Sequence, residues 1–117
     1  MQKIRKYTGS EDEFQKSVAL YLNSKGATWF HSPNGGSRNI IEATKLKAMG
    51  VKPGVPDVLI FNKKRGYSGL AIELKVKYNN VTLAQIDFLE RLSAEGWHTL
   101  VSWSLDEVCD TIDWYFG

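Results

Sequence analysis

The sequence contains few of the residues that several protein classes depend on. Its 117 residues include one cysteine, Cys109, which excludes a disulfide framework and a cysteine-based zinc site. Only two histidines are present, and His98 lies in an apolar stretch, so a histidine-based nuclease mechanism involving His31 is not favoured. With no sign of disulfide chemistry, we expect an intracellular, cytoplasmic protein.

Long hydrophobic runs are also missing. No apolar segment approaches the roughly 18 residues that a membrane span needs. The segment MQKIRKYTGSEDE is basic and then acidic, with no hydrophobic stretch behind the charges, so it does not predict a secretory signal. There is no internal repeat or low-complexity linker. We therefore expect residues 1–117 to form a single domain.

The charge balance is only mildly basic. The formal net charge is +2 and the isoelectric point is about 8.7, while 43% of the residues are hydrophobic and 24% are charged. This is an ordinary composition for a soluble globular domain. A nucleic-acid partner is compatible with the charge but is not required by it.

Hydrophobic spacing and helix caps predict alternating helices and strands. Ser10 and Glu13 form an S-x-x-E capping box before Phe14, Val18 and Leu22, which recur at helical spacing. The predicted elements are a helix ending near residue 25, a strand at 27–32, a helix at 40–49, strands at 58–61 and 69–76, a helix from 82 that ends at Gly96, a strand at 97–103 and a helix after Ser104. This α-β-α-β-β-α-β-α order predicts an α/β fold in which helices cover a mixed sheet.

The hairpin between the second and third predicted strands brings two carboxylates and a lysine together. If Phe61 lies opposite Gly69 in an antiparallel pair, Asp57 lies opposite Glu73, with Cβ atoms roughly 5 Å apart on one face. Lys75 shares that face because it lies two residues beyond Glu73.

Opposed carboxylates destabilise a sheet unless a cation lies between them. Mg²⁺ prefers oxygen ligands, typically one or two carboxylates with water and substrate phosphate. A neighbouring lysine can orient or help deprotonate water, or neutralise charge that develops on phosphate oxygens. An E-x-K pattern by itself is more often the wet face of an amphipathic strand. The combination of Asp57 with Glu73 and Lys75 on consecutive strands favours a nuclease.

These residues resemble a known signature. Pro56-Asp57 followed by Glu73-Leu74-Lys75 is similar to the PD-(D/E)XK nuclease motif. The ordered stretches SEDEFQ, HSPNGG, GVKPGVPDVLIF, GLAIELK, LAQIDFLERL and GWHTLVSWSLDEV resemble stand-alone, phage-type members of the virus-type replication-repair nuclease (VRR-NUC) family. The resemblance covers nearly the whole chain and implies a restriction-endonuclease-like mixed sheet flanked by helices. It also implies a bacterial cytoplasm, if a phage or prophage encodes the protein.

The resemblance implies roles for individual residues. Asp57 and Glu73 would be metal ligands and Lys75 the catalytic lysine, and the backbone carbonyl of Val76 would supply another ligand. An acidic residue of the first helix would complete the site, and Gln85 matches a glutamine position near the active site.

Glu11 and Glu13 compete for the place on the first helix. We choose Glu11, because Glu13 has a capping role and Glu11 precedes Phe14 and Val18 by three and seven residues, on the inward face.

The resemblance further implies a Mg²⁺- or Mn²⁺-dependent endonuclease that cuts branched DNA, such as four-way (Holliday) junctions, as a homodimer. The alternatives are a flap, fork or restriction-like nuclease, and a DNA-binding module without catalysis of its own. Candidate DNA contacts are Asn34, Arg38, Lys45, Lys47, Lys52 and Lys77, whereas the loop 62–68 lies at the far end of the hairpin and its charges are expected to be solvated. The aromatic residues at 114–116 are expected to serve both the core and a dimer face.

Overall fold

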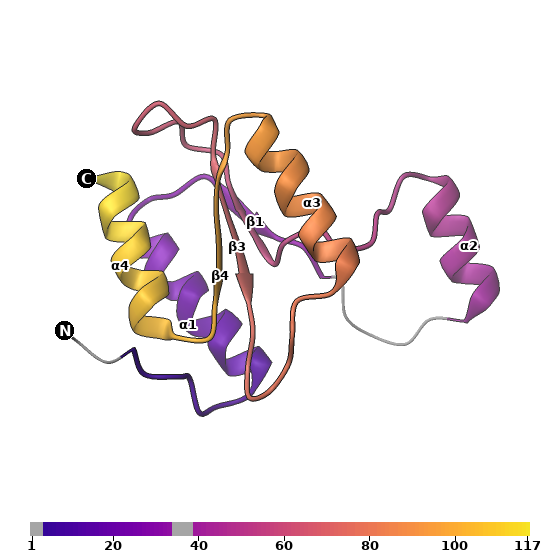
Figure 1. The fold of residues 1–117 in the computed structure, drawn as a ribbon, viewed down its shortest axis with the longest axis horizontal. Coiled ribbons are helices and arrows are strands. Elements are labelled where there is room, and N and C mark those ends of the chain that lie inside the picture. Colours follow the sequence, from indigo (N-terminus) through magenta and orange to yellow (C-terminus); the bar gives the residue numbers. More distant parts are fainter. Residues whose placement is uncertain (1–3, 34–38) are drawn as a thin grey trace.

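The computed structural model describes residues 4–33 and 39–117 and contains the predicted order of elements. These residues form four helices and a four-stranded sheet, and helices lie on both faces of the sheet (Figure 1). The elements are α1 (Glu11–Ser24), β1 (Trp29–His31), α2 (Ile40–Ala48), β2 (Val58–Ile60), β3 (Leu70–Leu74), α3 (Leu83–Ala94), β4 (His98–Ser102) and α4 (Leu105–Phe116). The strands are shorter than the sequence predicts, whereas the helices differ by one or two residues at their ends.

The sheet has the order β1-β2-β3-β4 and is mixed. β1 pairs with β2 and β2 with β3 in antiparallel fashion, while β3 and β4 are parallel. The predicted hairpin register is confirmed, because Val58 lies opposite Ile72 and Ile60 lies opposite Leu70. This register, continued by one residue, sets Asp57 against Glu73.

One face of the sheet carries the main hydrophobic core. The strand residues of this core pack beneath α1 and α4, and their side chains are buried. The core residues are Phe14, Val18 and Leu22 of α1, Val58, Ile60, Leu70, Ile72 and Leu74 of the sheet, and Val108, Ile112 and Tyr115 of α4. Each fully buried aliphatic or aromatic side chain contributes about 1.5–3 kcal/mol. This layer therefore holds β2 and β3, and with them the residues at their ends, in a fixed position.

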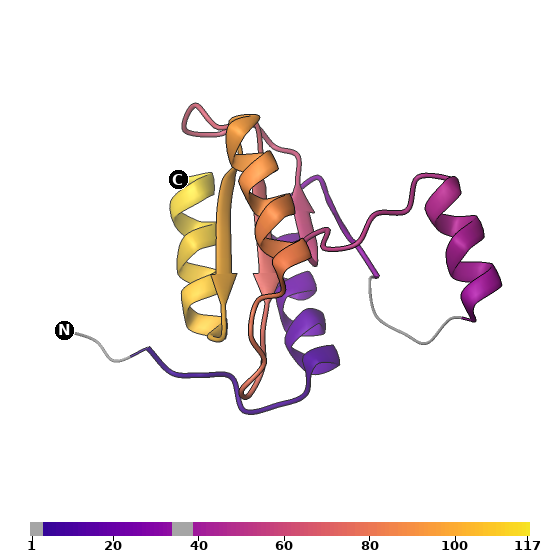
Figure 2. The same cartoon turned by 45° about the vertical axis from the view of Figure 1, so that its right-hand side comes forward.

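The opposite face is covered by α3, which lies over β4 and the adjacent part of the sheet (Figure 2). No residue of α3 is buried. The apolar spacing of the sequence predicts an inner side of this helix formed by Leu83, Ile86, Phe88, Leu89 and Leu92. Phe88, Leu89 and Leu92 are partly buried, but the side chains of Leu83 and Ile86 are 85% and 41% exposed. The prediction is wrong for these two residues, because a single short helix lies on this face and covers only part of it.

Helix α2 projects from the rest of the molecule (Figures 1 and 2). Asn39 caps it by accepting a hydrogen bond from the amide of Glu42 at 2.7 Å. None of its residues is buried, and Ile40 and Ile41 are more than 80% exposed, at 83% and 84%. No helix in the described part of the chain is long and apolar enough to span a bilayer.

Candidate active site

Asp57 lies immediately before β2 and reaches across to β3. Its backbone carbonyl accepts hydrogen bonds from the amide of Ser32 at 2.9 Å and from Nδ1 of His31 at 2.8 Å. Its carboxylate Oδ2 accepts a hydrogen bond from the amide of Leu74 at 2.8 Å. The end of β1 thus holds the backbone of Asp57, and β3 holds its side chain. These contacts fix the carboxylate beside Glu73. His31 has a structural contact here.

Glu73 and Lys75 are buried although both side chains ionise. Glu73 is 3% exposed and Lys75 is 8% exposed. The ammonium Nζ of Lys75 lies 3.5 Å from Oε2 of Glu73. Burial of a charged group is costly unless the group is paired and hydrogen-bonded. Glu73 and Lys75 therefore do not form the solvent-exposed face of an ordinary amphipathic strand.

Gln85 connects the two buried groups from the first turn of α3. Its Oε1 accepts a hydrogen bond from Nζ of Lys75 at 2.7 Å, and its Nε2 donates to Oε2 of Glu73 at 3.1 Å. The same Oε1 accepts from the amide of Thr82 at 2.9 Å, which completes a capping box at the start of the helix. Gln85 therefore contacts both predicted catalytic residues while it caps the helix that carries it.

The electrostatics of the site centre on Glu73. Burial, the charge of Asp57 and a hydrogen bond with Asp57 together raise the pKa of the Glu73 carboxyl from 4.5 to about 8, while Lys75 acts in the opposite direction. At neutral pH the Glu73 carboxyl is therefore protonated for most of the time. Two carboxyl groups therefore lie where a second negative charge is disfavoured. A bound cation would remove this repulsion.

A cavity of about 350 Å³ opens at these residues. It is lined by Glu11, Val55, Asp57, Glu73, Leu74, Lys75, Asn79, Asn80, Thr82 and Gln85. Glu11, the first residue of α1, reaches this cavity, whereas Glu13 is not part of its lining and its amide donates to Oγ of Ser10 at 3.2 Å. The geometry favours Glu11 over Glu13, and its role as a ligand stays a prediction.

The geometry offers less support for Val76. Its carbonyl accepts a hydrogen bond from the amide of Asn79 at 3.1 Å, and Val76 does not line the cavity. Leu74 does line it, so a backbone ligand from β3 is better placed there. The sequence could not distinguish these carbonyls, because the chain leaves the regular strand after Leu74 and turns at Lys77, whose φ is +55°.

Two of the six candidate DNA contacts line a second cavity, next to the candidate active site. Lys47 and Lys52 line a cavity of about 520 Å³ that shares Thr82 and Gln85 with the first. Lys45 is exposed on α2, and Lys77 is exposed beyond Lys75. Asn34 and Arg38 lie outside the described residues. Contact with DNA stays a prediction for all six.

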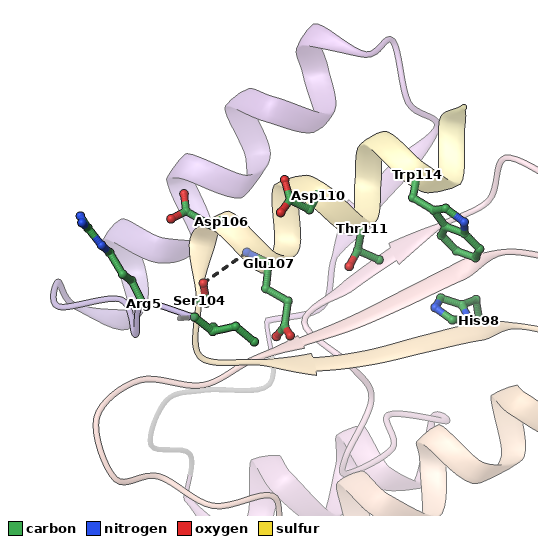
Figure 3. Close-up of a pocket in the computed structure, with 9 residues that line it drawn as sticks. Arg5, His98, Ser104, Asp106, Glu107, Asp110, Thr111 and Trp114 are labelled. Atoms are coloured by element: carbon green, nitrogen blue, oxygen red, sulfur yellow. Dashed lines mark hydrogen bonds between the residues drawn. The ribbon is translucent and has the colours of Figure 1, made fainter. Parts of the chain in front are cut away.

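A larger cavity lies elsewhere, between α4, β4 and the segment before α1. It measures about 930 Å³ and is lined by Ile4, Arg5, His98, Ser104, Asp106, Glu107, Asp110, Thr111 and Trp114. Figure 3 shows Glu107, Thr111 and Trp114 pointing from α4 towards β4. The ring of Trp114 lies 4.9 Å from that of His98. None of the four site residues lines this cavity, and it brings no buried ion pair together.

The far hairpin loop and the last aromatic residues contact each other. Arg65 donates from Nε to the carbonyl of Trp114 at 2.5 Å, and Nζ of Lys64 lies 5.9 Å from the ring centre of Phe116. Lys63, Lys64 and Arg65 are exposed, as expected, and Lys64 and Arg65 also contact the C-terminal aromatics. Tyr115 is fully buried and Trp114 is 40% exposed, so the expected division between core and surface is partly met.

Both the sequence and the fold of this chain are similar to those of known proteins. The sequence profile of the VRR-NUC domain matches residues 9–102. The chain belongs to the VRR-NUC family. A solved structure described as a VRR_NUC domain protein is 35% identical, covers 93% of this chain and 90% of its own, and has a TM-score of 0.73. A comparison with curated proteins gave no match. VRR-NUC domains are nucleases of the PD-(D/E)XK type, which confirms the predicted family and fold.

Nucleases of the PD-(D/E)XK type generally depend on a divalent metal, and the residues of this VRR-NUC domain fit one. Within residues 4–33 and 39–117 no three His, Cys, Asp or Glu side chains gather closely enough to bind a metal by themselves. The carboxylates of Asp57 and Glu73 would hold the ion, and two carboxylates are typical of Mg²⁺ sites that are completed by water and phosphate. The raised pKa of Glu73 agrees with an acid pair suited to a cation.

Gly54 is a positioning residue that the sequence did not reveal. Its φ is +80°, and a Cβ atom there would lie 2.3 Å from the carbonyl oxygen of Ala84 and 2.8 Å from the amide nitrogen of Gln85. The loop before Asp57 therefore packs its backbone directly on the first turn of α3. The only signal in the sequence was a glycine between Pro53 and Pro56, next to the catalytic aspartate.

Gly54→Ala is expected to lower the rate of DNA cleavage by about 10-fold or more, because the new Cβ displaces Gln85 from Lys75 and Glu73. Gly50→Ala is the matched control, since Gly50 also has a positive φ, of +109°, but nothing lies within 4 Å of its Cβ position. Both substitutions carry similar backbone strain, of about 1 kcal/mol. Single-turnover cleavage measured beside thermal unfolding separates displacement from strain, and equal losses of activity in the two variants would contradict this role.

Proposed function

We propose that this VRR-NUC domain is a Mg²⁺- or Mn²⁺-dependent endonuclease that hydrolyses phosphodiester bonds in branched DNA, four-way junctions above all, and acts as a homodimer in the cytoplasm. The observation that carries the proposal is the partly buried network of Asp57, Glu73, Lys75 and Gln85 in one cavity. Two acids, a lysine and a positioning amide are the groups that phosphodiester hydrolysis with water requires.

Each side chain has a distinct task in this mechanism. Asp57 and Glu73 provide the anionic oxygens, and Lys75 provides a buried positive charge 3.5 Å from Glu73. A divalent cation, when bound, supplies Lewis-acid stabilisation of charge on the phosphate oxygens. Lys75 orients the attacking water in line with the scissile bond and offsets the negative charge that grows on phosphorus oxygens.

Gln85 acts through its two neighbours. Because its amide contacts both Nζ of Lys75 and Oε2 of Glu73, it holds the lysine away from a direct short contact with the carboxylate. The lysine consequently keeps hydrogen-bonding capacity for water or phosphate. Glu11, on the wall of the cavity, is placed to contact water in the same space.

Support for a branched substrate comes from symmetry and from charge. A dimer with two-fold symmetry presents two active sites, which suits a junction with matching symmetry. The projecting helix α2 offers Lys45 and Lys47 beside exposed isoleucines, so it provides both phosphate contacts and apolar surface away from the body of the protein. Flap, fork and linear duplex cleavage are the competing activities. The intact catalytic set argues against a DNA-binding module without catalysis.

A cleavage panel tests the proposal. Purified protein is titrated with Mg²⁺ or Mn²⁺ against a four-way junction, a flap, a replication fork and a linear duplex of the same sequence. We expect metal-dependent cuts in the junction at least about 10-fold faster than in the duplex. Preference for the flap or fork would move the assignment to those substrates, and no cleavage of any substrate would contradict a nuclease acting alone. Light scattering with and without junction DNA tests the dimer, which a monomer in both states would contradict.

A further inference from the structure

Three aromatic side chains form an exposed ledge on the sheet. Phe30 and Phe61 stack with ring centres 6.0 Å apart and planes 13° from parallel, and Trp97 meets Phe61 edge-on at 5.7 Å. The side chain of Phe30 is 47% exposed and that of Phe61 is 46% exposed. Large aromatic side chains on a small soluble protein are usually covered more completely than this. We call Phe30, Phe61 and Trp97 the aromatic ledge.

The aromatic ledge shares a face with the catalytic carboxylates. Phe30 lies opposite Leu59 and Leu59 opposite Ala71, so these residues point to one side of the sheet. Ala71 precedes Glu73 by two residues and is therefore on the same face. Phe61 follows Leu59 by two residues and shares it too. The ledge lies on the α3 side of the sheet, as does the predicted metal site.

The spacing matches a few nucleotides. Phe61 is four residues from Asp57 along the chain, which corresponds to about 13 Å in an extended strand. Stacked bases advance about 3.4 Å along a strand, so this distance is about four steps of DNA. A strand whose phosphate lies at Asp57 and Glu73 can consequently bring neighbouring bases to the ledge.

The fold leaves the ledge open for a physical reason. Helix α3 packs over β4, and the part of this face above β1 and β2 has no helix of its own (Figure 2). Gly69 lets Trp97 lie flat at the border of the open area, because a Cβ at that position would come within 2.5 Å of the indole ring. The rings are therefore held in place by the sheet, while two of them keep a face towards solvent.

The charge around the ledge suits a polyanion. No acidic residue occurs between positions 14 and 41 or between 58 and 72, the two stretches that contain β1 and β2. Lys63, two residues beyond Phe61 in the chain, is exposed. Stacking on aromatic rings beside cationic side chains is how proteins bind single-stranded nucleic acid without reading its sequence.

We propose that the aromatic ledge binds unpaired bases that leave the duplex near a branch point, by stacking them on Phe30 and Phe61. The inference rests on the proposed function, since it assigns the ledge to the same DNA that is cut. The ledge selects substrates with accessible base faces, and a continuous duplex, whose bases are stacked on one another, gains nothing from it.

The test measures binding in EDTA by fluorescence anisotropy, so that cleavage does not enter. The probes are a 12-nucleotide oligothymidylate, a four-way junction with unpaired thymines at its centre, and a duplex with the arm sequence. The double variant Phe30→Leu, Phe61→Leu keeps apolar bulk but loses the ring faces. We expect it to bind the first two probes about 10-fold more weakly and the duplex within about 2-fold of wild type. Phe30→Tyr, Phe61→Tyr, which keeps the rings, is expected to bind all three as wild type does.

Three outcomes would overturn the inference. They are equal binding of the oligothymidylate by the leucine and wild-type proteins, no binding of oligothymidylate by wild type, and conversion of a dimer to a monomer by the leucine substitutions in light scattering. The last would make the ledge a protein interface. Absence of cleavage in the panel described above would instead count against the nuclease assignment, and it leaves this binding result unchanged.

Discussion

Replacement of Lys75 by alanine is expected to reduce the rate of DNA cleavage by about 1,000-fold. Among the described residues that line the candidate active-site cavity, Lys75 is the only cation, and its Nζ lies 3.5 Å from Oε2 of Glu73. The substitution removes the group that orients water and offsets charge on the phosphate. It also removes the partner that lowers the pKa of Glu73, so the carboxyl becomes harder to ionise.

Single-turnover cleavage at saturating Mg²⁺ measures this effect, with binding of the same DNA in EDTA as the second readout. Binding should change by less than about 3-fold, because Lys75 is buried and contacts phosphate only at the reacting position. Lys16→Ala is the matched control, since it removes one exposed lysine of α1 outside the cavity. If Lys75→Ala cleaves as fast as wild type, the assigned mechanism is wrong.

The sequence was sufficient for the parts of the fold that depend on local pattern. Helix caps and apolar spacing predicted every element in order, because these signals act within a few residues. The register of the hairpin was also predictable, since an antiparallel pair fixes all partners once one pair is known. The opposition of Asp57 and Glu73 followed from that register alone, before any tertiary contact was considered.

Other features depend on contacts between distant segments, and these were missed. The contact between Gly54 and α3 is made by backbone atoms, which every residue has. The role of Gly54 is therefore visible only in its φ angle and in the atoms around it. Leu83 and Ile86 have the spacing of an inner helical face, but α3 covers too little of the sheet to bury them. Gln85 was predicted near the site through the family resemblance, but its contacts with Lys75 and Glu73 could not be predicted without the position of α3 relative to β3.

Glu73→Gln is expected to abolish cleavage, by about 1,000-fold or more, and at the same time to stabilise the protein in EDTA at high pH. The first effect follows because a neutral amide replaces one of the two carboxylates that the hairpin is predicted to offer to the metal. The second follows from the pKa of Glu73, which is about 8 in the folded protein against 4.5 when unperturbed. Glutamine has nearly the same shape but cannot acquire the charge that is disfavoured beside Asp57.

The sign of the pH effect follows from proton binding. Between about pH 4.5 and pH 8 the folded protein holds a proton on Glu73 that the unfolded chain has released. The stability that this proton provides is fully present below about pH 4.5 and is lost as the pH rises through about 8. Wild-type protein in EDTA should therefore lose stability across this window, and Glu73→Gln should not lose this part of it.

Thermal unfolding in EDTA from pH 5 to pH 9 measures both proteins. Their Tm values should be similar at pH 5 and should differ by at least about 5 °C at pH 9, with the variant higher. Mg²⁺ should raise the Tm of wild type at pH 9 and leave that of Glu73→Gln almost unchanged, because the cation takes the place of the proton only where two carboxylates remain. Glu90→Gln, which alters an exposed carboxylate of α3, should follow wild type throughout. Parallel dependences of Tm on pH for wild type and Glu73→Gln would contradict this prediction. They would mean that ionisation of Glu73 does not destabilise the folded protein, so a metal would have no repulsion to relieve.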